Sequence, residues 1–104
     1  MKPGRQYGNQ HAGDGVREID LHLKPGHPAN DAIDRQLARV RGELDSAIRS
    51  GVREIVLVHG QGSGRLKDEI RKLIAGEYPM CIAGDASFAR YGYGGATLVI
   101  IKNI

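Results

Sequence analysis

Residues 53–65, with the sequence REIVLVHGQGSGR, restrict the fold of this chain more than any other stretch. The apolar run from Ile55 to Val58 predicts a short buried strand that ends at His59. Gly60-Gln61-Gly62-Ser63-Gly64 follows directly, and the apolar spacing beyond it predicts an amphipathic helix. A strand that turns through glycines into a helix exposes backbone N–H groups at the helix N-terminus. That arrangement suits an anion, typically a phosphate.

The spacing of this loop argues against nucleotide cofactors. It lacks the GxxxxGK[ST] pattern of a triphosphate loop, and it reads GxGxG rather than the GxGxxG of dinucleotide-binding folds. A sugar–phosphate backbone is a better ligand, with Arg65 and Lys67 as neighbouring cations. The alternative is a tight turn whose glycines serve only to allow positive φ.

Asp20 and His22 form a second polar pair. Residues 16–23 alternate apolar and polar side chains, which predicts a strand with one buried face, and places Asp20 and His22 together on the other. Asp20 could orient His22, or the two could supply metal ligands, although a solvated polar face would give the same pattern. If this strand is a parallel neighbour of the one before His59, both histidines lie where open α/β sheets bind ligands.

The remaining segments complete a β-α-β-α-β-β order. A long helix capped by Asn30 or Asp31 runs to about Ser50, and its internal Gly42 would be explained by a close approach of another element. The helix after the loop ends near Gly76, and residues 80–86 and 97–101 read as strands. We expect a mixed four-stranded sheet with both helices on one face. Residues 97–101 read as a central strand buried on both faces.

A second glycine-rich stretch, residues 88–96, interleaves Arg90, Tyr91 and Tyr93 with glycines. Aromatic rings beside an arginine and exposed backbone can stack unpaired bases. The tyrosines could equally cover the edge of a hairpin, and the two interpretations stay open at this point.

Composition allows these interpretations without requiring them. The 104 residues are 40% hydrophobic and 26% charged, with a formal charge of +3. This fits one globular domain and permits a nucleic-acid partner. We expect residues 1–16 to form a flexible lead-in or linker and residues 17–104 the domain. The single cysteine, Cys81, favours a cytoplasmic setting, and no apolar run is long enough to cross a membrane.

Together these segments resemble the Smr domain, the small MutS-related module found at the end of MutS2-type proteins and as free-standing proteins. The resemblance covers residues 19–102. The family pattern is a DLHG strand end, an HGxGxG loop and a GGxGxT run. The matching segments are Asp20-Leu21-His22, residues 59–64 and residues 92–97. Leu23 and Tyr93 stand where the family has glycine.

The resemblance implies a two-layer α/β sandwich like the C-terminal domain of bacterial translation initiation factor three. It also implies nucleic-acid binding, with endonuclease activity on DNA or RNA in several members. Family roles carry over to Asp20, His22, His59 and the glycines of the HGxGxG loop. Binding tolerates the changes at Leu23 and Tyr93 more easily than cleavage does.

We therefore expect a nucleic-acid-binding Smr domain, part of a larger protein, that hydrolyses phosphodiester bonds in DNA repair, recombination or RNA metabolism. Asp20, His22 and His59 are the expected catalytic residues. The expected phosphate- and nucleic-acid-binding residues are Gly60, Gln61, Gly62, Ser63, Gly64, Arg65, Lys67, Arg90, Tyr91 and Tyr93. No metal site is assigned, and a divalent cation such as Mg²⁺ or Mn²⁺ is left open. The alternative is a non-catalytic module that binds structured or branched nucleic acid, or a protein.

Overall fold

Four strands form one mixed sheet in the computed structural model, which describes residues 16–22, 29–60, 64–92 and 94–102. The strands are β1 (Val16–Asp20), β2 (Glu54–Val58), β3 (Cys81–Asp85) and β4 (Ala96–Ile101), and the helices are α1 (Ala29–Ser50), α2 (Arg65–Glu77) and α3 (Phe88–Tyr91). Their spatial order is β1-β2-β4-β3. The β1–β2 pair is parallel and the other two pairs are antiparallel. The predicted mixed sheet is thus confirmed.

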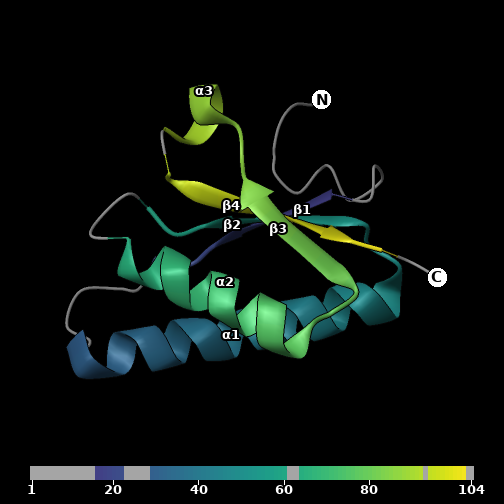
Figure 1. The fold of residues 1–104 in the computed structure, drawn as a ribbon, viewed down its shortest axis with the longest axis horizontal. Helices are drawn as coiled ribbons and strands as arrows, with labels where there is room; N and C mark the ends of the chain where they lie inside the picture. Colours follow the sequence, from purple (N-terminus) through teal and green to yellow (C-terminus); the bar gives the residue numbers. More distant parts are fainter. Residues whose placement is uncertain (1–15, 23–28, 61–63, 93, 103–104) are drawn as a thin grey trace, which may run out of the picture.

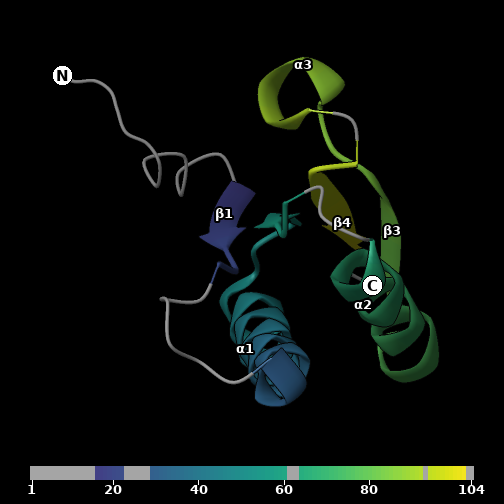
Figure 2. The same cartoon turned by 90° about the vertical axis from the view of Figure 1, so that its left-hand side faces the viewer.

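Both long helices lie on one face of the sheet, as expected for a two-layer α/β sandwich (Figure 1). Viewed from the side, α1 runs beneath β1 and β2, and α2 runs beneath β4 and β3 (Figure 2). The short helix α3 was not predicted, and it stands on the opposite face. A single helical turn is too short to show the apolar periodicity on which sequence prediction depends.

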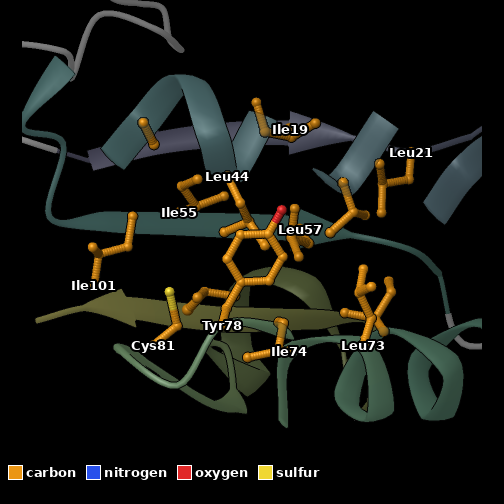
Figure 3. Close-up of a cluster of buried hydrophobic side chains, with 14 residues drawn as sticks. Ile19, Leu21, Leu44, Ile55, Leu57, Leu73, Ile74, Tyr78, Cys81 and Ile101 are labelled. Carbon is orange, nitrogen blue, oxygen red and sulfur yellow. The ribbon is translucent and has the colours of Figure 1, made fainter. Parts of the chain in front are cut away.

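The core fills the space between this sheet and the two helices (Figure 3). Leu44 from α1, Leu57 from β2 and Ile70 from α2 are completely buried. Burial of each such side chain is worth about 1.5–3 kcal/mol, so this contact orients the helices on the sheet. Tyr78, just after α2, closes the core at one end and donates a hydrogen bond to Asp45 Oδ1 at 2.8 Å.

The opposite face of the sheet is largely open. β4 is a central strand as predicted, but the prediction that both its faces are buried is wrong, because Ile100 is 40% exposed. Its cross-strand neighbour Ile82 is 48% exposed. The reason is that both long helices cover the same face, where Thr97, Val99 and Ile101 are buried.

Glycines mark the helix ends and one helix interior. Gly51 ends α1 with a φ of 76°, and the N–H of Val52 donates to the carbonyl of Ala47, as in a Schellman motif. The helix begins at Ala29, before the predicted caps. The close approach predicted at Gly42 is wrong, because a Cβ there would meet nothing within 4 Å.

Some sequence predictions fall outside the described residues. These are the flexible lead-in, apart from Val16, and the departures Leu23 and Tyr93. The strand β1 already starts at Val16, one residue before the predicted domain boundary. Among the described helices, none combines the length and apolar character needed to span a membrane.

Candidate nucleic-acid interface

The carboxyl ends of β1 and β2 meet at one edge of the sheet. Asp20 pairs with Val58 in the parallel register, and the N–H of Leu21 donates to the Val58 carbonyl at 2.9 Å. His22 and His59 follow directly after these residues. The predicted juxtaposition of the two histidine-bearing strand ends is therefore present.

Asp20 and His22 form an exposed, closely bonded pair. Asp20 Oδ1 accepts a hydrogen bond from the His22 backbone N–H at 2.9 Å and lies 2.6 Å from Nδ1 of the ring. The backbone hydrogen bond is the main reason why the pKa of Asp20 lies below its usual value. An ionised carboxylate only accepts hydrogen bonds, so Nδ1 carries a proton and Nε2 points away from Asp20.

The free side of the His22 ring faces the glycine turn. A Cβ built on Gly60 would lie 3.1 Å from His22 Nε2, and Gly60 has a φ of 81°. Both facts favour glycine at this position, because a side chain would be strained and would press on the imidazole. The Asp20–His22 pair thus stands directly beside the start of the HGxGxG loop.

Helix α1 supports the end of β1 through two polar side chains that sequence reasoning missed. Arg39 Nη1 donates to the Asp20 carbonyl at 3.0 Å, and Gln36 Nε2 donates to the Leu21 carbonyl at 2.9 Å. The two residues are three apart, so they share one side of the helix. The spacing of Gln36 and Arg39 indicates a shared helix side, but the sequence does not show which strand end the two side chains contact.

His59 is almost completely buried, with 9% of its surface exposed. Its Nδ1 lies 2.9 Å from the Gly60 carbonyl and its Nε2 lies 2.9 Å from Thr97 Oγ1. Burial is the main cause that lowers the pKa of His59, and the positive charges of Lys67 and Arg71 add to it. A carbonyl only accepts, so in the neutral ring Nδ1 donates to Gly60 and Nε2 accepts from the Thr97 hydroxyl.

The second glycine-rich stretch docks on the first through its backbone. The Gly95 carbonyl accepts hydrogen bonds from the N–H groups of His59 at 3.2 Å and Gly60 at 2.9 Å. A Cβ on Gly95 would collide with the carbonyl oxygen of Tyr91. Two motifs more than thirty residues apart in the sequence therefore form one structural unit.

Helix α2 starts from Gly64, which has a φ of 84° and no side chain to cap the helix. The Asp68 N–H donates to the Gly64 carbonyl at 3.0 Å, so the N–H groups of residues 65–67 point toward the loop. Of the predicted phosphate-binding loop, Gln61, Gly62 and Ser63 lie outside the described residues, whereas Gly60 and Gly64 are described and both have a positive φ. Arg65 and Lys67 lie in the first turn of α2.

Lys67 belongs to an ion-pair cluster that the sequence did not reveal. Asp85, at the end of β3, lies 2.9 Å from Arg71 Nη2 and 3.5 Å from Lys67 Nζ. The Arg71 hydrogen bond, followed by the charge of Lys67, lowers the pKa of Asp85. Lys67 and Arg71 are four apart on α2, but nothing in the sequence links either of them to Asp85.

Arg90 and Tyr91 lie on α3, over the open face of the sheet (Figure 2). Arg90 stacks 5.7 Å from the centroid of the Tyr91 ring, and its Nη2 lies 3.9 Å from Glu18 Oε1. Burial, with help from the Glu18 carboxylate, raises the pKa of Tyr91. The structure therefore places these two predicted binding residues beside Glu18, two residues before Asp20 in β1, while Tyr93 lies outside the described residues.

Within the described part of the chain, no group of three or more His, Cys, Asp or Glu side chains could hold a metal ion. Asp20 and His22 offer two potential ligands among the residues that the structure describes. The fit to a divalent cation is thus partial.

The sheet, the two helices on one face and the polar edge at the ends of β1 and β2 define a small α/β sandwich domain. The model of the Smr domain family matches residues 19–102, and the chain belongs to this family of nucleic-acid-binding modules. Among solved structures, it is similar to the Smr domain of Thermus thermophilus MutS2, with 26% identity and a TM-score of 0.67. That match covers 83% of this chain and 98% of the other. No curated protein sequence matches the chain.

Proposed function

We propose that this domain binds the sugar–phosphate backbone of DNA or RNA at the ends of β1 and β2 and cleaves a phosphodiester bond there. The observation that carries the proposal is the Asp20–His22 pair, exposed and directed at Gly60 beside the start of α2. The base His22 and the group that orients it, Asp20, lie at the end of β1, and the backbone N–H donors that begin α2 follow the neighbouring strand β2 in the chain.

In this proposal His22 is the general base. Asp20 holds the Nδ1 proton, so Nε2 presents a lone pair to a water molecule, or to a ribose 2′-hydroxyl in RNA. The nucleophile gives its proton to Nε2 and forms a bond to phosphorus, and the P–O bond to the leaving sugar oxygen breaks. That oxygen takes a proton from solvent. Such proton transfer contributes about 10²–10⁴ in rate.

The phosphate is held by the start of α2. The N–H groups of its first turn and the ammonium of Lys67 stabilise the negative charge that grows on the phosphoryl oxygens. A divalent cation such as Mg²⁺ or Mn²⁺ would be held by Asp20 rather than by His22, whose lone pair serves as the base, and would supply Lewis-acid stabilisation of the same charge.

His59 has a different role in the proposal. Both its ring nitrogens are engaged, with Gly60 and Thr97, and its pKa is lowered by burial, so it suits positioning better than proton transfer. We propose that it holds Gly60 in the position that faces His22. By analogy with the matched domain of MutS2, we further propose that the chain works as part of a larger protein.

The test is cleavage of supercoiled plasmid and of structured RNA, with and without EDTA, by the wild type, His22→Ala and Asp20→Asn. We expect about 10²–10⁴-fold slower cleavage in His22→Ala with binding retained. Glu77→Gln is the matched control for Asp20→Asn, because Glu77 is also an exposed, hydrogen-bonded carboxylate, at the far end of α2. Full cleavage by His22→Ala would contradict its role as base. Salt-sensitive binding without cleavage by the wild type would leave a non-catalytic binding module.

A further inference from the structure

Asp85 places a negative charge beside the cations of the proposed phosphate site. Its carboxylate lies between two side chains of α2, 2.9 Å from Arg71 Nη2 and 3.5 Å from Lys67 Nζ. The carboxylate itself is exposed, with 61% of the side-chain surface accessible. A carboxylate in this position presents oxygens to the cations much as a phosphate would.

The cluster formed by Asp85, Lys67 and Arg71 adjoins the second glycine-rich stretch and is not an isolated surface pair. Lys67 lies in the first turn of α2, and a Cβ on Gly94 would come 3.8 Å from its Nζ. The charges of Lys67, Arg71 and Asp85 all act on the pKa of the buried His59. A phosphate held by the start of α2 would therefore feel both the attraction of Lys67 and the repulsion of Asp85.

We propose that Asp85 is an internal counter-anion that holds Lys67 in the free domain and releases it to a nucleic-acid phosphate on binding. The inference rests on the proposed binding of nucleic acid at this edge. Asp85 weakens binding to any single phosphate, so it favours ligands that make several phosphate contacts at once, as a nucleic-acid backbone does.

The two contacts of Asp85 differ, and the difference indicates that Lys67, rather than Arg71, leaves Asp85 to bind a phosphate. The contact with Lys67 is the longer one, and Lys67 is one helical turn nearer to the loop than Arg71. Arg71 is held more closely, because its Nη2 donates a hydrogen bond to Asp85 Oδ1 at 2.9 Å. Exposed ion pairs contribute little net stability, so the Lys67 contact can be exchanged at small cost.

The test measures the affinity of the full chain for a short single-stranded oligonucleotide and for a duplex, over a range of salt concentrations. Asp85→Asn removes the charge and nearly preserves the shape of the side chain. We expect about twofold to fivefold tighter binding at low salt. The slope of log K against log salt should stay close to that of the wild type, because Lys67 contacts a phosphate in both complexes.

Two further variants separate this mechanism from a general change of net charge. Glu77→Gln adds the same unit of charge at a carboxylate paired with Arg41, and it should leave affinity nearly unchanged. In a Lys67→Gln background, Asp85→Asn should bring no gain, because the cation it would release is absent. A gain that persists in this background, or an equal gain in Glu77→Gln, would overturn the inference.

The remaining outcomes are also decisive. If the wild type binds and Asp85→Asn binds no more tightly, the inference fails while the proposed function stands. If the wild type does not bind even at low salt, the proposed function fails and the inference with it. Should Asp85→Asn not fold, Lys67→Gln alone decides: its salt slope should be shallower than that of the wild type by about 0.7–0.9, and an unchanged slope would refute the exchange.

Discussion

The imidazole of His59 and the hydroxyl of Thr97 lie 2.9 Å apart and join the end of β2 to the start of β4. The Gly60 carbonyl occupies the other ring nitrogen at 2.9 Å. This bridge, together with the two backbone hydrogen bonds to Gly95, holds His59 and Gly60 in place. Gly60 limits the position of the His22 ring, because a Cβ at Gly60 would lie 3.1 Å from His22 Nε2.

The Thr97 hydroxyl should contribute measurably to stability. Thr97→Val keeps the shape of the side chain but leaves the buried Nε2 of His59 without a partner. We expect a loss of about 1–3 kcal/mol in the free energy of unfolding, measured by urea denaturation. Thr97→Ser keeps the hydroxyl and should lose less. Equal losses in the two variants would show that the hydroxyl contributes nothing.

The buried His59 should make stability depend on pH on the acid side. Its pKa is lowered in the folded state, so the unfolded chain binds the proton more readily than the folded one. The stabilisation is present above the usual histidine value of 6.5 and is lost as pH falls below it. Thermal unfolding between pH 7.5 and about pH 5 should show this decline in the wild type and in His22→Ala.

The matched variant for this prediction is His59→Gln, which has no titrating ring. The melting temperature of His59→Gln should be lower than that of the wild type at neutral pH and should change less between pH 7.5 and about pH 5. A wild-type decline that His59→Gln reproduces in full would assign the effect to other groups.

Replacement of Gly95 by alanine should disrupt the joined loops. The new Cβ would collide with the Tyr91 carbonyl, so α3 or the Gly95 backbone must move and the hydrogen bonds to His59 and Gly60 would weaken. We expect a loss of about 2 kcal/mol or more in the free energy of unfolding.

Gly42→Ala is the control for Gly95→Ala, and its expected change in the free energy of unfolding has the opposite sign. Gly42 lies inside α1, and a Cβ there meets nothing within 4 Å. Alanine is better than glycine in a helix interior by about 0.5–1 kcal/mol, so this variant should be more stable than the wild type. A loss of stability in Gly42→Ala would contradict the open surroundings of this residue.

Tyr78 should produce a second pH dependence, on the alkaline side. Burial and the hydrogen bond to Asp45 raise the pKa of Tyr78 to about 12. The folded state therefore keeps the phenol proton more tightly than the unfolded chain, so the stabilisation is present below pH 10 and is lost as pH rises toward 12. Tyr78→Phe should unfold more easily at neutral pH and lose less stability between pH 10 and 12 than the wild type.

Local patterns of apolar residues in the sequence were sufficient to predict most of the fold. Apolar alternation around Ile19, the run before His59 and the helical stripes each have a period that only one kind of secondary structure satisfies. The two βα units followed by a hairpin then restrict the topology of the sheet to few choices. The open face around Ile100 was not foreseen, because an apolar run looks the same whether one face of its strand is covered or both.

For the site, the sequence determined which residue types are present, and its alternation predicted that Asp20 and His22 share a face. The two side chains do meet, although β1 ends at Asp20. Tertiary structure alone decided the rest. It buried the ring of His59 against Thr97, turned His22 toward Gly60, and brought Asp85 between Lys67 and Arg71. Each of these relations joins residues from different elements, and only the packing of helices on the sheet fixes their distances.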